Sequence, residues 1–318
     1  MSLLDVRNLS VRVSTATAVE GVSFAVADGE TLALVGESGC GKTLTALSVL
    51  RLTPPAAVIE AQIVVLRGRE LTRLTDRQMR DVRGKEVGVV FQDPLTALNP
   101  VWSVGEQVAE GLRLHDGLGR RAAWERAVEA LREVGIADPG RRASEYPHQL
   151  SGGMRQRAII ATALACRPPL LIADEPTTAL DVTLQAQIID LLLYLREERR
   201  LSILLITHDL GVVAELAHRV AVMYAGQVVE SADVATLFRR PLHPYTRALL
   251  AAVPRLDGGA GRLVTIEGAV PDPSRYPAGC RFAPRCPSAL EACRQPQELR
   301  ELEPGHWVRC GRAGEWTT

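Results

Sequence analysis

The chain contains short, continuous runs of apolar residues separated by segments with a helical repeat. Such runs occupy residues 31–35, 87–91, 170–173 and 201–207. A continuous apolar run of this length is typical of a parallel strand that is covered on both faces. Residues 43–50 follow the first run, contain neither glycine nor proline, and are expected to form a helix. The pattern therefore predicts an α/β core.

A different pattern fills the stretch between the second and third apolar runs. Its apolar positions recur at helical spacing and share one face: Trp124, Ala127, Val128, Leu131 and Val134. Gly135 follows and is expected to end that helix. We predict a helical subdomain over about residues 93–157, inserted into the core.

The chain of 318 residues exceeds one ordinary domain, and its last part differs in composition from the rest. After about residue 253 it is rich in proline, glycine and arginine, which favours irregular loops over a second sheet. We therefore expect a large core domain at residues 1–253 and a small extension at residues 254–318.

Composition narrows the classes of protein to consider. A hydrophobic content of 47% is typical of a globular chain with a sizeable core. The 37 basic and 37 acidic residues cancel, so no overall basic field attracts nucleic acid, and no nucleic-acid partner is expected. No apolar run approaches the roughly 20 residues that cross a bilayer, and no secretory signal begins the chain. We expect a protein of the reducing cytoplasm without disulfides.

The first apolar run ends in a segment that matches the phosphate-loop pattern in full. Its residues are Gly36, Glu37, Ser38, Gly39, Cys40, Gly41, Lys42 and Thr43. It lies between a predicted strand and a predicted helix, as the pattern requires, and its glycines let backbone N–H groups curl around phosphates. Lys42 is expected to reach the β- and γ-phosphates, and Thr43 to bind Mg²⁺. The segment predicts a site for ATP and Mg²⁺.

The third apolar run ends in two acidic residues, Asp174 and Glu175. In open α/β folds, ligands bind at the carboxyl ends of the strands. Asp174 suits the magnesium shell, and Glu175 is placed to polarise the water that attacks the γ-phosphate. Two acids that end a strand are often solvated surface, but a complete phosphate loop in the same chain favours the catalytic interpretation.

Four further segments carry a resemblance to a known family. Residues 150–157, Leu-Ser-Gly-Gly-Met-Arg-Gln-Arg, resemble the signature motif of ABC ATPases and precede the acidic strand as they do there. Gln92 resembles the glutamine of the Q-loop, residues 179–181 resemble the D-loop, and His208 resembles the switch histidine. Six motifs in order, over about residues 3–230, make the resemblance specific.

This resemblance implies a fold and a way of working. The fold is α/β, a P-loop NTPase core of ABC type with an inserted helical subdomain, an antiparallel β subdomain and a small cysteine-containing extension. Ser151, Gly152 and Gly153 would form a second anion cradle that closes on the ATP held by another subunit. Gln92 would join the Mg²⁺ shell and the catalytic group of Glu175 and His208, and Asp181 would lie at the same nucleotide.

Three segments narrow the resemblance to one subfamily. Residues 92–100, residues 176–183 and the sequence His-Pro-Tyr-Thr at residues 243–246 look like the ATPases of oligopeptide, dipeptide and nickel importers. The resemblance implies a peptide importer at the cytoplasmic face of the membrane. Its partners would be two transmembrane permease subunits, an extracytoplasmic solute-binding protein and a second ATPase, identical or homologous. Nickel or another solute remains an alternative, because the ATPase does not touch the solute.

Four of the six cysteines crowd into the extension, at Cys280, Cys286, Cys293 and Cys310. Four thiols suffice to enclose a metal. Zinc sites typically use pairs two to four residues apart, a spacing that is absent here, whereas iron–sulfur ligation accepts other spacings. This extension resembles the one that holds a [4Fe–4S] cluster in the ATPases of peptide importers. We expect that cluster, with zinc and four uncoordinated thiols as the alternatives.

Two other classes of function remain open from the sequence. An ABC protein of DNA repair or translation usually carries long coiled-coil insertions or two ATPase units, and this sequence has neither. A redox or metal sensor would use the same motifs, with ATPase activity reporting the state of the extension. Iron content measured beside the ATPase rate in oxidised and reduced samples separates the sensor from the transporter.

Overall fold

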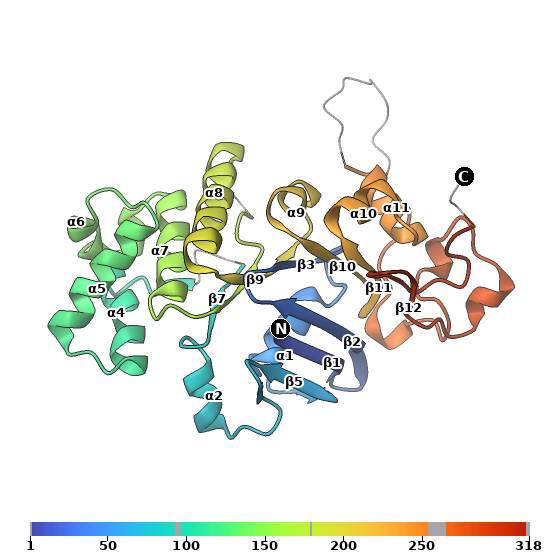
Figure 1. The fold of residues 1–318 in the computed structure, drawn as a ribbon, viewed down its shortest axis with the longest axis horizontal. Coiled ribbons are helices and arrows are strands. Elements are labelled where there is room, and N and C mark those ends of the chain that lie inside the picture. The colour runs from blue at the N-terminus through green and yellow to red at the C-terminus, as the bar shows by residue number, and fades with distance from the viewer. Residues whose placement is uncertain (1, 93–96, 179, 254–264, 316–318) are drawn as a thin grey trace. The chain divides into compact units, whose positions relative to one another are not determined.

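The computed structural model describes residues 2–92, 97–178, 180–253 and 265–315, and these form two compact units (Figure 1). The first unit consists mainly of Ala27–Glu30 and Arg73–Leu205. The second consists of Ser2–Val26, Thr31–Thr72 and Ile206–Thr318. The expected boundary after residue 253 borders residues 254–264, which lie outside the described part of the chain, so that boundary stays a prediction.

The first unit combines parallel strands with most of the long helices. Its elements are α2 (Asp76–Val82), β7 (Val87–Val90), α4 (Val104–His115), α5 (Arg120–Glu133), α6 (Pro139–Ala143), the 3-10 turn η1 (Pro147–Gln149), α7 (Gly152–Leu164), β8 (Leu170–Asp174), α8 (Val182–Arg199) and β9 (Ser202–Thr207), whose last two residues belong to the second unit. The strands lie in the order β9, β8, β7. Strands β7 and β8 are parallel, with Val87 opposite Leu170. The parallel strands predicted from the apolar runs are confirmed.

The inserted helices pack on one another through small and apolar side chains. Helix α5 contacts α4, α6 and α7 (Figure 1). Its buried face consists of Ala123, Ala127, Ala130 and Leu131. Gly135 follows the helix with φ of +76°, a conformation that side chains other than glycine rarely adopt. The expected helical insertion and its stop at Gly135 are confirmed, while its start near residue 93 lies outside the described residues.

The second unit holds an antiparallel sheet, a second sheet and the C-terminal region. Its elements are β1 (Ser2–Val13), β2 (Ala16–Ala27), β3 (Thr31–Val35), α1 (Lys42–Val49), β4 (Ala57–Glu60), β5 (Ile63–Leu66), β6 (Arg69–Glu70), α9 (Leu210–Leu216), β10 (Arg219–Tyr224), β11 (Gln227–Asp233), α10 (Val234–Arg239), α11 (Pro244–Ala251), the 3-10 turns η2 (Pro273–Arg275), η3 (Ala283–Arg285) and η4 (Glu291–Arg294), β12 (Arg300–Glu303) and β13 (His306–Val308). Strand β1 pairs antiparallel with β4 and β5, which confirms the antiparallel β subdomain.

The second sheet of this unit continues into the C-terminal extension. In this unit its strands follow the order β12, β13, β11, β10, β3. The expectation of irregular loops after residue 253 is wrong for residues 300–308. Pro304 and Gly305 form the turn of a hairpin there, with Gly305 at φ of +76°, and a Pro-Gly pair in a sequence is equally typical of a loop. A buried contact joins β13 to β11: His306 Nε2 lies 2.7 Å from Glu230 Oε1, and both side chains are buried.

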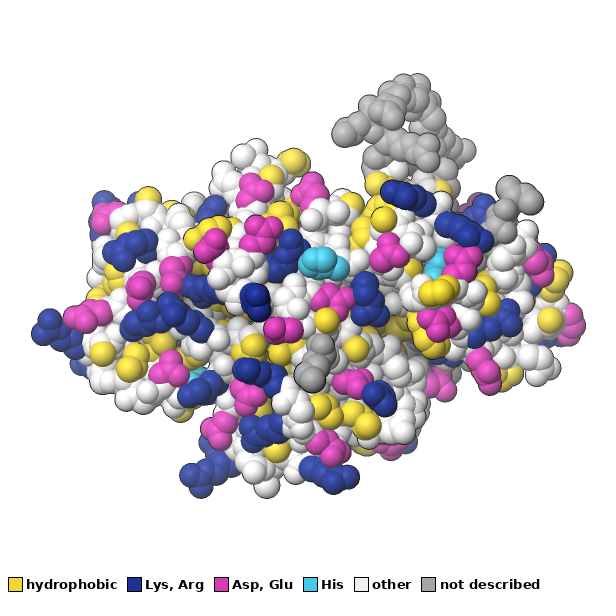
Figure 2. Space-filling view, viewed as in Figure 1, with side chains coloured by type: hydrophobic (Ala, Val, Ile, Leu, Met, Phe, Trp, Pro, Cys, Tyr) yellow, Lys and Arg dark blue, Asp and Glu magenta, His cyan; other side chains and the backbone are white. Residues whose placement is uncertain are grey.

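Two observations concern the helices and the surface. Within the described ranges, we find no helix with the length and apolar character to pass through a bilayer. Basic and acidic side chains are interspersed over the face shown in Figure 2, without an area where only lysine and arginine gather. This mixture agrees with the formal net charge of zero and gives no support to a nucleic-acid surface on that face.

Three glycines shape the loop between β3 and α1, and two of them have close neighbours. A Cβ on Gly36 would lie 2.2 Å from the carbonyl oxygen of Met223 in β10, and Gly36 has φ of +148°. Gly41, at φ of +98°, caps α1, and a Cβ there would lie 3.2 Å from Val19. Gly39 has φ of +80° but open space around it. The loop therefore depends on close backbone approach at Gly36 and only on backbone freedom at Gly39.

Alanine substitutions at Gly36 and Gly39 should differ in cost. Gly39→Ala meets only the left-handed strain, about 1–2 kcal/mol. Gly36→Ala also drives a methyl group into the Met223 backbone, so it should lower the free energy of unfolding by about 3 kcal/mol or more. Chemical denaturation of both variants measures the difference. Equal destabilisation by the two substitutions would contradict the close approach at Gly36.

Candidate functional site

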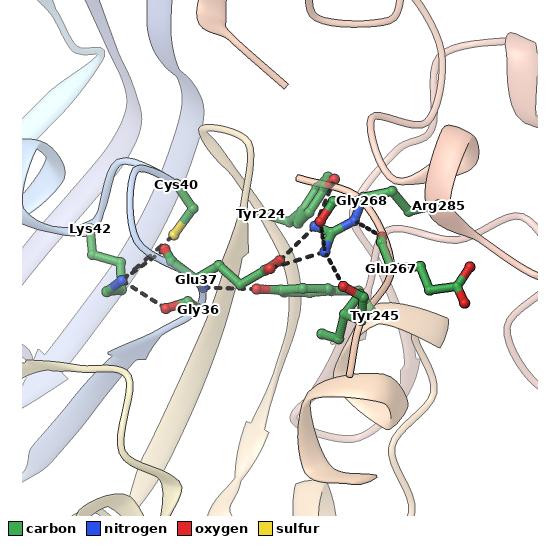
Figure 3. A network of polar contacts seen from close by, with 10 residues as sticks. Gly36, Glu37, Cys40, Lys42, Tyr224, Tyr245, Glu267, Gly268 and Arg285 are labelled. Atoms are coloured by element: carbon green, nitrogen blue, oxygen red, sulfur yellow. Dashed lines mark hydrogen bonds and ion pairs between the residues drawn. The ribbon is translucent and has the colours of Figure 1, made fainter. Parts of the chain in front are cut away.

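The phosphate loop holds the Lys42 ammonium inside its own curve (Figure 3). Lys42 Nζ donates to the carbonyl oxygens of Gly36 at 2.7 Å and Glu37 at 3.0 Å. The Lys42 side chain is only 5% exposed, and a buried ammonium needs such partners. The loop thus places a positive charge beside the N-terminus of α1, where the helix dipole adds to it.

The other residues predicted for the loop lie together with Lys42 in the second unit. Ser38 and Gly39 are exposed at its tip, and Thr43 lies in the first turn of α1. Cys40 is buried, and burial raises the pKa of its thiol. The carbonyl of Cys40 accepts a hydrogen bond of 2.9 Å from Gly226 N–H in the turn between β10 and β11. Cys40 is therefore a packed residue of the loop and not a reactive thiol.

Glu37, a variable position of the phosphate-loop pattern, is held by residues that the sequence analysis missed. Its backbone N–H donates to Tyr245 Oη at 2.9 Å, and its carboxylate pairs with Arg285 at 2.7 Å. Tyr245 belongs to the His-Pro-Tyr-Thr segment, which in the sequence indicates only the subfamily. No local sequence signal joins these positions, because they are far apart along the chain.

The switch-histidine candidate, His208, is exposed directly after β9 in the second unit. Asp209 follows it and caps α9, accepting from Gly211 N–H at 2.8 Å. This cap fixes the start of the helix immediately after the histidine. His208 therefore lies on a defined turn at the carboxyl end of its strand.

The first unit brings two of the predicted catalytic residues together. Gln92 Nε2 donates to Glu175 Oε2 at 3.0 Å, and Thr178 Oγ1 donates to the same oxygen at 2.8 Å. Asp174 is 2% exposed at the end of β8. Glu175 follows with φ of +47°, in the left-handed region that non-glycine residues seldom occupy. Such strain at a polar residue is common at functional sites.

The signature segment begins a helix with an exposed N-terminus. Ser151 is the N-cap of α7, and its Oγ accepts from Met154 N–H at 3.4 Å. Ser151 and Gly152 are exposed, whereas a Cβ on Gly153 would lie 2.8 Å from Leu184. The first N–H groups of a helix lack intrahelical partners, and such an end attracts anions. The arrangement suits the predicted anion cradle.

A buried glutamine ties this helix to the acidic strand of the same unit. Gln156 is 2% exposed, and its side chain donates to the carbonyl of Pro176 at 2.6 Å. Asp181 caps α8 and accepts from Leu184 N–H at 2.9 Å. Gln156 is part of the signature pattern but was not predicted as a site residue. Ala179, within the predicted D-loop, lies outside the described residues.

The four cysteines predicted as cluster ligands all lie among the described residues. Cys280 N–H donates to the carbonyl of Cys293 at 2.8 Å. Burial raises the pKa of Cys280 to about 11, and it also raises the pKa values of Cys286 and Cys310, with neighbouring thiols adding to the effect. Among the described residues, no group of three or more His, Cys, Asp or Glu side chains is placed to hold a metal ion. The expected [4Fe–4S] cluster is not supported by this geometry.

The extension is also ordered by contacts that involve no cysteine. Phe282 is 2% exposed and packs on Tyr224 and Tyr245, with ring centroids 5.2 and 5.3 Å away. This aromatic core, shared with β10 and α11, was not predicted from the sequence.

Comparison with known families agrees with the motifs. Residues 19–178 match the model of the ABC transporter family, which includes the phosphate loop and the acidic strand. Residues 229–293 match the model described as the oligopeptide/dipeptide transporter, C-terminal region.

Curated relatives extend over nearly the whole chain. A probable peptide ABC transporter ATP-binding protein of Sinorhizobium fredii is 53% identical over 320 residues, covering 98% of this chain and 96% of that protein. A putative peptide import ATP-binding protein of Brucella abortus is 53% identical over 312 residues, covering 97% of this chain and 94% of that protein.

Solved structures show the same fold. An ATP-binding cassette, solved as a dimer in a post-hydrolysis state with ADP and Pi, matches with a TM-score of 0.64 and 28% identity, covering 73% of this chain and 98% of that one. Part of an ABC transporter complex from Clostridium perfringens matches with a TM-score of 0.65 and 27% identity, covering 75% and 91%. The chain belongs to the ATP-binding subunits of ABC transporters, in the group that carries the oligopeptide/dipeptide transporter C-terminal region.

Proposed function

We propose that this chain binds and hydrolyses ATP to drive the import of di- or oligopeptides across the cytoplasmic membrane. The observation that carries the proposal is a complete phosphate loop in one chain with the C-terminal region of oligopeptide/dipeptide transporters. Relatives of more than half identity are named as peptide import ATP-binding proteins. Nickel or another solute of the same subfamily is the alternative, because an ATPase subunit does not contact the solute.

Nucleotide binding is assigned to the phosphate loop. Lys42 and backbone N–H groups of the phosphate loop would bind the phosphates, in keeping with the buried ammonium and the helix N-terminus. Thr43, Gln92 and Asp174 offer oxygen ligands, the kind that Mg²⁺ prefers, so they fit that ion. Bound Mg²⁺ would neutralise part of the phosphate charge during transfer.

Catalysis of water attack is assigned to Glu175, with Gln92 and His208 as further catalytic residues. The hydrogen bonds from Gln92 and Thr178 and the left-handed backbone fix the Glu175 carboxylate in one orientation. A fixed carboxylate is suited to orient and polarise a water molecule. The arrangement therefore supports Glu175 as the general base.

A second ATPase subunit, identical or homologous, is proposed to complete the site. Ser151, Gly152 and Gly153 would bind the ATP held by the other subunit, supported by the exposed N-terminus of α7. Asp181 would lie at the same nucleotide. The solved relative is a dimer bound to ADP and Pi, which agrees with such an arrangement.

The membrane partners are proposed to be two permease subunits, with a solute-binding protein on the outer side. The first unit exposes large apolar side chains between β7 and α4: Phe91 is 43%, Val101 73% and Trp102 43% exposed. Exposed aromatic and aliphatic groups of this kind mark protein contacts. They lie close to Gln92 in sequence, so a permease that meets them would act near the catalytic glutamine at the cytoplasmic face.

Two finer assignments accompany this function. Residues 1–253 are proposed as the nucleotide-binding domain, with the helical subdomain at about residues 93–157, and residues 254–318 as the importer-type extension. A [4Fe–4S] cluster at Cys280, Cys286, Cys293 and Cys310 is proposed on the number of thiols and the subfamily alone. No step of ATP hydrolysis depends on it.

Substitution of Glu175 tests the hydrolytic assignment. Glu175→Gln should bind MgATP as the natural chain does but lose hydrolysis by about 10²–10⁴-fold, because the base is removed while the shape is kept. Phosphate release and binding of a fluorescent ATP analogue measure the two properties. Glu197→Gln, which changes an exposed carboxylate on α8, serves as the control. Hydrolysis near the natural rate in Glu175→Gln would reject the assignment.

Analysis of iron tests the cluster. Protein purified without oxygen should contain about four iron and four sulfide per chain if the cluster is present. Cys286→Ser should then remove the colour while MgATP binding survives. Zinc in place of iron, or four thiols that are freely alkylated in the folded protein, would reject the cluster.

A further inference from the structure

A short segment of the extension reaches the phosphate loop with two arginines. It runs from Cys280 to Cys286 and includes the turn η3. Arg281 is 8% exposed and the Arg285 side chain 5% exposed, which is unusual for arginine. Phe282 lies between them in the sequence and is buried in the aromatic core described above. The segment is therefore anchored, with both guanidinium groups directed into the second unit.

Arg285 forms a two-pronged ion pair with the phosphate loop (Figure 3). Its Nη1 and Nη2 donate to the two carboxylate oxygens of Glu37 at 2.7 and 3.0 Å. The same guanidinium donates to the carbonyls of Glu267 at 2.8 Å and Ile266 at 3.2 Å. The hydrogen bonds with Glu37 raise the pKa of Arg285, so the charge is permanent. Paired geometry of this kind is specific to arginine and is not reproduced by lysine.

Glu37 links Arg285 to Lys42 and Cys40 of the phosphate loop. Its N–H donates to Tyr245 Oη at 2.9 Å, and its carbonyl accepts from Lys42 Nζ at 3.0 Å and from Cys40 N–H at 3.3 Å. The side chain, the N–H and the carbonyl of one residue are thus all held. Moving the Glu37 side chain would therefore shift a carbonyl that positions the Lys42 ammonium.

Arg281 supports the loop from a second direction. Its guanidinium donates to the carbonyl of Ala225 and pairs with Glu20 of β2. The residue after Ala225, Gly226, donates from its N–H to the Cys40 carbonyl at 2.9 Å. Both arginines therefore act on the loop through the residues that hold it, and neither is part of the phosphate-loop pattern itself.

We propose that Arg285 is a positioning residue of the phosphate loop, through which the C-terminal extension sets the affinity for the phosphates of ATP. The proposal rests on the proposed function, in which this loop binds MgATP. Arg285 acts in two ways: it fixes Glu37, and it neutralises a carboxylate that would otherwise repel the bound phosphates. Both effects concern binding, so the rate at saturating ATP should depend on Arg285 much less than the affinity does.

The test compares matched arginine substitutions in the full chain. Arg285→Met should raise the Kd for MgATP about ten-fold, a typical strength for coupling between sites, and KM for ATP by a similar factor. The value of kcat should stay within about two-fold. Arg285→Lys should give Kd and KM values between those of the natural chain and Arg285→Met, because lysine keeps the charge but loses the paired geometry. Arg294→Met, at an exposed ion pair of the same extension, should change none of these values.

A double-mutant cycle separates positioning from general damage to the fold. In the Glu37→Gln background, Arg285→Met should weaken MgATP binding by less than about three-fold, because the carboxylate that it holds is gone. If Arg285→Met fails to fold, the same cycle with Arg285→Lys tests whether Arg285 acts through Glu37. If Arg285→Met weakens MgATP binding equally in the natural chain and in Glu37→Gln, the pairing of Arg285 with Glu37 is not the cause, and the inference is overturned.

Two outcomes distinguish failure of this inference from failure of the proposed function. If Lys42→Ala abolishes MgATP binding but Arg285→Met leaves the Kd unchanged, the loop binds ATP and the inference is overturned. If the natural chain does not bind MgATP at all, the proposed function is overturned and the inference with it. A loss of kcat at unchanged KM would also overturn the inference, because it would place Arg285 in the chemical step.

Discussion

The close approach of backbone to backbone at the phosphate loop is the constraint on which the nucleotide site depends. The chain must turn from β3 into α1 while passing so near Met223 that only glycine fits at Gly36. That turn is what directs the carbonyls of Gly36 and Glu37 toward the Lys42 ammonium. Anion binding then follows from the N–H groups of the loop and the helix dipole. Hydrogen bonds to Glu37 and Cys40 hold the turn from outside the loop.

Features that local sequence determines were predictable. Glycines at the loop, a serine cap at Ser151 and acids at the end of β8 each act within a few residues of themselves, so their pattern carries the geometry. The contact of Gln92 with Glu175 was not predicted, because the sequence indicated Gln92 only by resemblance to the Q-loop. The link from Arg285 to Glu37 was not predictable, since an arginine in a loop-rich segment gives no sign of its partner. The hairpin at β12 and β13 was missed because its Pro-Gly turn resembles any loop.

The extension is ordered by contacts that its composition does not reveal. Its four cysteines suggest a metal, whereas the described structure orders the segment through Phe282 and two buried arginines. Aromatic packing and charge-assisted hydrogen bonds supply stability without any metal. The same contacts explain how a region outside the ATPase motifs belongs to one unit with the phosphate loop. In this chain the extension is thus part of the structure that supports nucleotide binding.

Hydrolysis is proposed to need Lys42 of one chain and Ser151 of another at the same nucleotide. Mixing Lys42→Ala subunits with Ser151→Arg subunits, under conditions where light scattering shows dimers of this chain, tests that sharing most directly. A mixed dimer keeps one site with both groups intact, while each parent has none. The account predicts a steady-state ATPase rate in the mixture well above that of either parent. Mixed dimers as inactive as both parents would contradict it.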